Sequence, residues 1–319
     1  MKKILITGIS GQDGIFLTNY LIRNNKDLKI LGISRSDAEK TIYKKLKYLG
    51  LKEFINIDTF NINLNDYDIV KQFISEQKPD AVYNFSGPSS VYESYIKAEN
   101  KDLILNIFNN LIMSLIETNN FATFYQASSS EMFGNNSSHL DENSNFNPNS
   151  PYAEAKLVNH LKVKELYEKY DWKIFSGIMF NHESEFRENN YLIMKIIHSA
   201  RNIKKGKENN LTLGSLDYVR DWSYVKDIVN SIYAITTNGS SPDYVIGSGK
   251  GHSIKEVVAY VFNHFELDWK KYVEIDKNLL RKGDPEIIVS NPKKLQNEFN
   301  LKSEYSFTQM LDRCILGFK

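Results

Sequence analysis

A tyrosine and a lysine four positions apart, Tyr152 and Lys156, follow the dipeptide Ser150-Pro151, which is typical of a helix start. Residues four apart share one face of a helix. A tyrosine normally titrates at a pH of about 10, but a neighbouring ammonium favours the phenolate, which can accept a proton from an alcohol. The pair therefore predicts a catalytic base, Tyr152, assisted by Lys156.

A serine-rich segment, Ser128-Ser129-Ser130-Glu131, lies upstream at the end of an expected strand. We expect the Ser129 hydroxyl to hydrogen-bond the substrate oxygen that Tyr152 deprotonates. Together with Lys156, which would also hold a nicotinamide ribose, these residues predict hydride transfer at a secondary alcohol.

The carboxylate of Glu131 adds a second kind of chemistry. When the C4 hydroxyl of a sugar becomes a ketone, the C5 proton becomes acidic. A carboxylate beside it can remove that proton, so that water leaves from C6 by β-elimination, and hydride return to C6 regenerates the cofactor. The structural alternative is that Glu131 caps a turn or pairs with a lysine.

The elements that position these residues begin at the N-terminus, where residues 2–7 predict a buried strand. Gly8, Gly11 and Gly14 follow it, and Ile15 opens an amphipathic helix. Gly8 permits a tight turn, Gly11 lets the backbone approach a pyrophosphate, and Gly14 lets helix and strand pack closely. With phosphates at the helix N-terminus, the segment predicts a dinucleotide site.

Strands then alternate with helices, which predicts an α/β fold with a doubly wound parallel Rossmann sheet. Strands are expected at 29–34, 54–62, 80–85 and 122–128, and helices up to about residue 48, after an Asn65 cap, and over 101–118. Ligands bind beyond the carboxyl ends of such strands. From about residue 181 the pattern is less regular. We therefore expect a dinucleotide-binding domain over 1–180 and a smaller mixed α/β substrate domain over 181–319, with interleaved segments.

The end of the second expected strand bears on the choice of cofactor. Arg35 and Ser36 supply a cation and a hydroxyl, which suit a 2′-phosphate, whereas NAD-specific sites usually have an acidic residue there. NADP is therefore the expected cofactor. Asp37 lies close enough to keep NAD as an alternative.

Composition excludes several classes of function. The 319 residues carry a net charge of +1, which gives no reason to expect nucleic acid or a membrane surface as partner. The single cysteine, Cys314, rules out an intrachain disulfide and a cysteine metal cluster, and its apolar surroundings predict a packed thiol. No apolar run reaches the roughly 18 residues that span a bilayer. We expect a cytoplasmic enzyme with no metal site.

The sequence resembles the extended short-chain dehydrogenase/reductases, in which GxxGxxG is the usual glycine spacing. Within that group it is most similar to the GDP-mannose 4,6-dehydratases. The matching motifs are residues 7–14, 82–84, 124–131, 150–153 with Lys156, 180–184 and 220–222, with fainter similarity around Arg281 and 284–285.

The resemblance implies roles for individual residues. The catalytic set is Ser129 (threonine in the family), Glu131, Tyr152 and Lys156. Besides Tyr152 and Lys156, the implied cofactor contacts are Gly8, Gly11, Gln12, Asp13, Gly14, Arg35, Ser36, Asn63, Leu64, Phe85, Ser86, Gly87, His182 and Arg187. The implied nucleotide-sugar contacts are Ser89, Ser130, Asn181, Lys195, Arg220 and Arg281.

The implied activity is an NADP-dependent lyase that converts GDP-mannose or a related GDP-sugar to the 4-keto-6-deoxy sugar, a precursor for polysaccharides. The alternatives are a C4 dehydrogenase or 4-epimerase of the same family, and a non-catalytic dinucleotide sensor. Relatives pair through two long helices, here 101–118 and 151–169, so a homodimer or homotetramer is expected. The chain departs from the family pattern at Asn63, at 86–90, at Phe186 and in a shorter loop after Arg35.

Overall fold

The computed structural model describes residues 1–35, 38–136, 138–280 and 284–317. The chain forms two compact units built from interleaved segments. The first unit comprises residues 1–132, 148–179 and 229–244, and the second comprises 133–147, 180–228 and 245–319. Residues 133–147 thus precede the predicted boundary at residue 180 but belong to the second unit, whereas 229–244 follow it and belong to the first.

A seven-stranded sheet with the strand order β11-β7-β5-β4-β1-β2-β3 dominates the first unit. Neighbouring strands from β7 to β3 run parallel. The predicted doubly wound sheet is confirmed, and its order reverses at β1, where β2 and β4 flank the first strand. The strands are β1 (Lys2–Thr7), β2 (Leu28–Ser34), β3 (Ile57–Asn61), β4 (Ala81–Asn84), β5 (Thr123–Ser129), β7 (Ile174–Met179) and β11 (Asp243–Ile246).

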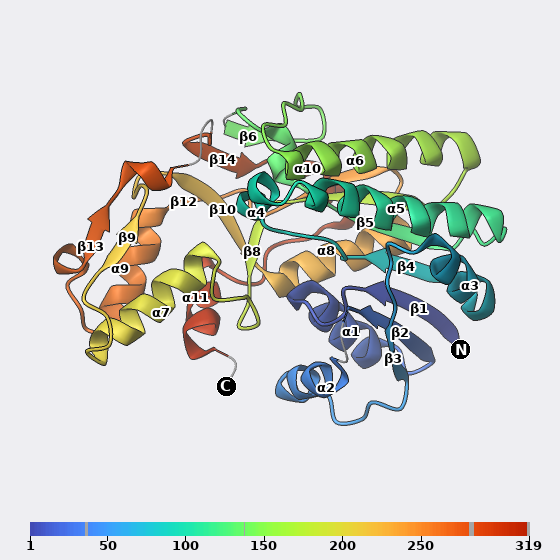
Figure 1. Cartoon of the computed structure of the whole chain (residues 1–319), viewed down its shortest axis with the longest axis horizontal. Coiled ribbons are helices and arrows are strands. Elements are labelled where there is room, and N and C mark those ends of the chain that lie inside the picture. The colour runs from blue at the N-terminus through green and yellow to red at the C-terminus, as the bar shows by residue number, and fades with distance from the viewer. Residues whose placement is uncertain (36–37, 137, 281–283, 318–319) are drawn as a thin grey trace. The chain divides into compact units, whose positions relative to one another are not determined.

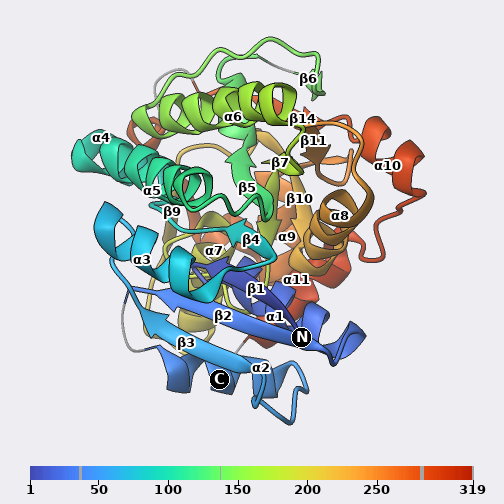
Figure 2. The same cartoon turned by 90° about the vertical axis from the view of Figure 1, so that its right-hand side faces the viewer.

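Helices cover both faces of this sheet (Figure 1). α3, α5 and α6 pack beside one another on one face, and α1, α2 and α8 lie on the other, as the view along the sheet shows (Figure 2). The helices are α1 (Gln12–Asn24), α2 (Glu39–Tyr48), α3 (Tyr67–Gln77), the short α4 (Val91–Ile96), α5 (Glu99–Glu117), α6 (Pro151–Tyr170) and α8 (Val225–Asn238).

The cap of α3 differs from the expectation. The Asp66 side chain, not that of Asn65, accepts a hydrogen bond from Ile69 N at 3.2 Å. Asn65 lies in the preceding turn, where its backbone N–H donates to Asn63 Oδ1 at 3.1 Å. This local turn holds Asn65 outside the helix and leaves the next residue to cap it.

The core between the sheet and α5 explains why the strands are apolar throughout. Leu5, Val82, Phe124 and Ile174 come from four neighbouring strands and pack in one cluster with side chains of α5. Strands buried on both faces need apolar residues at successive positions. Removing this area from water is the main stabilising term, and it fixes the strand ends on which the polar residues sit.

The second unit contains a smaller mixed sheet and a two-stranded ribbon. β10 (Val219–Tyr224) pairs parallel with β8 (Asn181–Glu183) and β14 (Ile287–Ser290), and antiparallel with β12 (Gly251–Ser253). The other elements are β6 (Ser138–Leu140), β9 (Leu211–Leu213), β13 (Val273–Ile275), α7 (Leu192–Lys204), α9 (Ile254–His264), α10 (Lys293–Phe299), α11 (Phe307–Leu316) and two short 3₁₀ turns at 269–271 and 277–279.

Cys314 lies in α11 and is fully buried, so the predicted packed thiol is confirmed. Burial raises the pKa of this thiol well above its ordinary value. Across the described part of the chain, no helix combines the length and the apolar character that a membrane span requires.

Candidate active site

The glycine-rich turn after β1 has the shape of a phosphate cradle. Gly8 has a φ of +69°, and a Cβ there would come within 3.0 Å of the Phe85 carbonyl group. A Cβ on Gly14 would lie 2.6 Å from the Cα of Ile9, so only glycine lets α1 start this close to the turn. Gly11 is the N-cap of α1, and no side chain of the described residues makes a cap hydrogen bond to the helix. This uncapped N-terminus fits the pyrophosphate of a dinucleotide.

The other predicted cofactor residues of the first unit stand at the carboxyl ends of neighbouring parallel strands. Arg35 is exposed directly after β2, and Ser36 lies outside the described residues. Asn63 is exposed beyond β3, whereas Leu64 is buried and belongs to the core cluster. Directly after β4 come Phe85, Ser86 and Gly87, which are half-buried, whereas Ser89 is exposed.

The end of β5 carries the predicted serine and carboxylate. Ser129 is the last residue of the strand, and Ser130 begins a 3₁₀ turn that contains Glu131. The Ser129 Oγ accepts a hydrogen bond from Glu131 N at 3.2 Å. Ser129 and Ser130 are buried, and Glu131 is half-buried. Ser129 and Glu131 therefore belong to one hydrogen-bonded turn at the end of β5.

α6 presents the tyrosine and the lysine. Ser150 Oγ caps the helix by accepting from Ala153 N at 3.1 Å, and Pro151 occupies its first turn, which confirms the predicted helix start. Tyr152 is buried, and its backbone N–H donates to Ser94 Oγ at 3.3 Å. The Lys156 Nζ lies 5.6 Å from the centroid of the Tyr152 ring.

Lys156 is held against the strand that carries Ser129. Its Nζ donates to the Ala127 carbonyl oxygen at 2.8 Å, two residues before Ser129. Only 8% of Lys156 is exposed, and desolvation by burial lowers the pKa of its amine from 10.5 to about 8, although the charge of Asp13 opposes part of this shift. The structure therefore brings Lys156 and Tyr152 together on the edge of the first unit that also carries Ser129.

The remaining predicted contacts belong to the second unit. Asn181 and His182 lie in β8, opposite Trp222 and Ser223 of β10. The His182 Nδ1 is 2.8 Å from the Phe180 carbonyl oxygen, which holds the ring in place. Lys195 is exposed in the first turn of α7 and donates to the Thr212 carbonyl oxygen at 3.1 Å.

Two predicted arginines of this unit are paired with acidic residues that sequence reasoning did not identify as partners. Arg187 lies 3.2 Å from Glu183 Oε2 and stacks 3.8 Å from the Tyr191 ring centroid. Arg220 Nη2 donates to Asp284 Oδ1 at 2.9 Å, and its Nη1 donates to two backbone carbonyl oxygens. Both guanidinium groups are therefore oriented within their own unit. Arg281 lies outside the described residues.

Asp221 is a further structural residue that the sequence did not reveal. It is fully buried, and its carboxylate accepts hydrogen bonds from Ser248 N at 3.0 Å, Gly249 N at 2.9 Å and Ser290 N at 3.2 Å. These bonds tie β10 to the loop before β12 and to β14. The available signal was its place beside Arg220 in a recognised motif.

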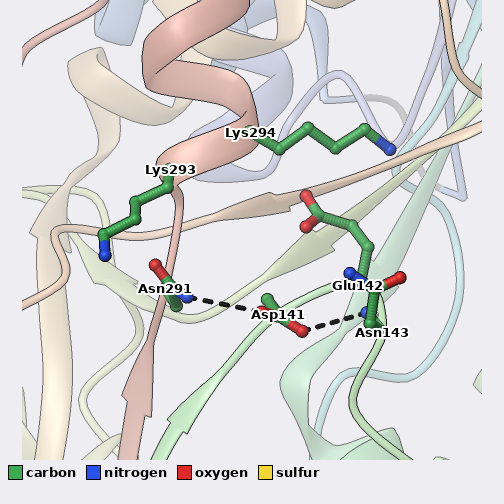
Figure 3. Close-up of a pocket in the computed structure, with 6 residues that line it drawn as sticks. All are labelled: Asp141, Glu142, Asn143, Asn291, Lys293 and Lys294. Atoms are coloured by element: carbon green, nitrogen blue, oxygen red, sulfur yellow. Dashed lines mark hydrogen bonds between the residues drawn. The ribbon is translucent and has the colours of Figure 1, made fainter.

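A cavity of about 430 Å³ opens elsewhere in the second unit, lined by Asp141, Glu142, Asn143, Asn291, Lys293 and Lys294 (Figure 3). Its acidic side chains already support the local backbone. Asp141 accepts from Asn143 N and Asn291 Nδ2, and Glu142 accepts from Val245 N at 2.7 Å. Among the described residues, none of those predicted from the sequence to form the site lines this cavity.

Comparison with known proteins gives a consistent result. A family model described as GDP-mannose 4,6 dehydratase matches residues 5–314. GDP-mannose 4,6 dehydratase 2 of Arabidopsis thaliana is 30% identical over 329 residues, covering 98% of this chain and 86% of that protein. GDP-mannose 4,6 dehydratase of Cricetulus griseus is 30% identical over 338 residues, covering 98% and 90%.

Solved structures resemble the fold at lower identity. A dTDP-glucose 4,6-dehydratase from Bacillus anthracis in complex with NAD has a TM-score of 0.84 at 20% identity, with 99% of this chain and 96% of that chain covered. RMD from Pseudomonas aeruginosa complexed with NADPH has a TM-score of 0.82 at 19% identity, with 99% and 98% covered.

Proposed function

The chain belongs to the GDP-mannose 4,6-dehydratase family and is a nucleotide-sugar 4,6-dehydratase, and we propose that it acts on GDP-mannose or a related GDP-sugar with NADP as cofactor. The product is the 4-keto-6-deoxy sugar nucleotide, and water is released. The relatives named above support the sugar nucleotide, and residues of the first unit support the roles that follow.

The cofactor site proposed for the first unit uses the glycine turn and the end of β2. The uncapped N-terminus of α1 holds the pyrophosphate, with Gly8, Gly11 and Gly14 clearing the approach. Arg35, exposed after β2, pairs with a 2′-phosphate. When bound, the nicotinamide would supply the redox chemistry, as the hydride acceptor for C4 of the sugar and the hydride donor for C6.

Three side chains act at C4. Tyr152 removes the proton of the C4 hydroxyl, and the Lys156 ammonium stabilises the phenolate that Tyr152 needs for this task. Ser129 Oγ accepts from Glu131 N, so its own O–H is directed elsewhere and donates to the C4 oxygen.

Glu131 acts at C5 and C6. Its carboxylate takes the C5 proton, which the C4 ketone has made acidic. The C6 hydroxyl leaves with a proton as water, and C5 later regains a proton that has exchanged with solvent. The observation that carries this assignment is the turn at the end of β5, where the Ser129 hydroxyl is bonded to the backbone of Glu131 and Ala127 holds Lys156.

The test is Glu131→Gln, which keeps the shape of the side chain and removes its basicity. We expect dehydration of GDP-mannose, followed as a mass loss of about 18, to fall more than about a hundredfold, as is usual on loss of a general acid–base group. Glu154→Gln is the matched control, because Glu154 pairs with Lys101 on the exposed side of α6. An enzyme that stops at C4 would show no such mass loss, and it would keep most of its activity at C4 in both variants.

We also propose that the protein forms a homodimer through α5 and α6. Both helices leave apolar side chains in water, with Met113 44%, Val158 53% and Leu161 52% exposed. These positions lie on the faces of the two helices that the sheet does not cover. A second copy of the chain would remove this apolar area from water.

A further inference from the structure

A row of polar side chains crosses the middle of the large sheet. Thr7 of β1 is the register partner of Asn84 of β4, Asn84 that of Gln126 of β5, and Gln126 that of Ser176 of β7. We call these four residues the polar row. Each is at most 2% exposed, although the strands around them are apolar. The row therefore lies inside the core, where a polar group needs a particular reason to be present.

Hydrogen bonds link three members of the polar row in one direction. Thr7 Oγ1 donates to Asn84 Oδ1 at 2.7 Å, and Asn84 Nδ2 donates to Gln126 Oε1 at 2.9 Å. Gln126 Nε2 then donates to the Ala127 carbonyl oxygen at 2.9 Å. Each amide accepts at its oxygen and donates at its nitrogen, so the chain fixes the orientation of both amides.

The chain ends on the acceptor of the catalytic lysine. The Ala127 oxygen receives Gln126 Nε2 and Lys156 Nζ at once, at 2.9 Å and 2.8 Å. A carbonyl oxygen has two acceptor positions, and Gln126 occupies one of them. The other is thereby left for the lysine.

The polar row also fixes the rotation of α6. His160 lies one turn after Lys156, and its Nδ1 is 2.8 Å from Ser176 Oγ. Tyr152, Lys156 and His160 follow one another at intervals of four, so they share one face of the helix. That buried face is not uniformly apolar, because it includes Lys156, Asn159 and His160. Two directed polar contacts, one turn apart, therefore link this face of α6 to β5 and β7.

Burying these groups has a cost that a purely structural role does not require. An amide in the core is tolerated only when it is hydrogen-bonded, and an apolar replacement of both partners is often neutral for stability. Tyr83, the neighbour of Asn84, is buried, and its hydroxyl makes a hydrogen bond to Thr236 at 3.0 Å. The amides of Asn84 and Gln126 instead form a chain of hydrogen bonds that ends at the carbonyl oxygen bound by Lys156.

We propose that Gln126, oriented by Asn84, is a positioning residue that holds the Ala127 carbonyl, and with it the Lys156 amine, in place for Tyr152. The proposal rests on the roles of Tyr152 and Lys156 in the proposed function. Without the Gln126 amide, the carbonyl can turn and the amine loses its fixed place near the tyrosine. The phenolate is then less favoured, so a smaller fraction of Tyr152 is ionised and able to remove the proton.

The decisive variant is Gln126→Met, which keeps the length of the side chain and removes both hydrogen bonds. We expect kcat for dehydration to fall roughly tenfold at neutral pH, with an unchanged KM for the nucleotide sugar. The acidic limb of the pH profile of kcat should move up by about one unit, because the base is charged only at higher pH. Asn84→Asp removes the donor one step earlier and should give a smaller shift in the same direction.

A titration of the free protein gives a readout that does not depend on turnover. The tyrosinate absorbance of Tyr152 is the difference between a protein and its Tyr152→Phe form, recorded against pH. This difference should appear at higher pH in the Gln126→Met background than in the natural background. Tyr83→Phe is the matched control, since it removes a buried hydrogen bond from β4, the strand of Asn84, without touching the chain of amides.

The outcomes separate this proposal from the proposed function. If Gln126→Met is folded and both its pH profile and its Tyr152 titration match those of the natural protein, the positioning role is refuted. The same holds if Tyr83→Phe shifts them equally. If the natural protein does not dehydrate any GDP-sugar but the Tyr152 titration still moves in Gln126→Met, the proposed function fails and the positioning role stands.

Discussion

Lys156→Met is expected to change how the stability of the first unit depends on pH. The buried Lys156 amine has its pKa lowered from 10.5 to about 8, mainly because burial penalises its charge. The unfolded chain therefore binds more protons than the folded chain between these two values, and the free energy of unfolding rises with pH across that window. Below about pH 8 the folded protein bears the cost of a buried ammonium.

The magnitude follows from the two pKa values. Between about pH 7 and about pH 9.5, linkage gives this one group a gain in the free energy of unfolding of about 2 kcal/mol. Methionine has nothing to titrate, so the natural protein should gain about 2 kcal/mol relative to Lys156→Met over this interval. Groups that do not interact with Lys156 contribute equally to both proteins and cancel in the difference.

The assay is equilibrium urea unfolding at both pH values, followed by the fluorescence of Trp172. This tryptophan is buried in the core of the first unit, whereas Trp222 and Trp269 belong to the second. A Trp222→Phe/Trp269→Phe background therefore isolates the first unit. Lys162→Met, on the exposed side of α6, is the control and should differ from the natural protein by a constant amount. A constant difference for Lys156→Met as well would refute the reasoning.

Two further outcomes are expected. Arg35→Ala should weaken binding of NADP at least about tenfold and leave the affinity for NAD nearly unchanged, since a charged hydrogen bond to the 2′-phosphate is lost. Cofactor titration by fluorescence measures both affinities. Equal losses of affinity for the two cofactors would contradict this prediction. Leu161→Glu should convert a dimer to a monomer in sedimentation, because it places a charge in the proposed apolar interface. Lys162→Glu beside it serves as the control, because it replaces one charged side chain by another. An unchanged mass for Leu161→Glu would exclude the α5–α6 interface.

Much of the first unit was predictable because its signals are local. The glycine turn, the Ser150-Pro151 helix start and the four-residue spacing of Tyr152 and Lys156 each depend on neighbours in the sequence, and the structure has them as expected. The α3 cap was predicted wrongly because Asn65 and Asp66 are both good caps and a local turn decides between them.

Features that depend on distant residues were not accessible from the sequence. The hydrogen bonds among Thr7, Asn84 and Gln126 require the register of three strands that are far apart along the chain. The partner of Arg220, Asp284, is 64 positions away. Interleaved segments were expected, but which segments cross, such as 133–147, depends on tertiary packing. In each case the residue types are visible in the sequence, but their pairing is set by the fold.

The elimination at C5 and C6 is tested most directly by turnover of GDP-mannose in deuterated water. In the proposed mechanism, Glu131 removes the C5 proton and solvent replaces it, so the product that has lost water should carry one deuterium at C5. Product kept in deuterated water without the protein controls for spontaneous exchange. Product formed with its original hydrogen at C5 would contradict the mechanism.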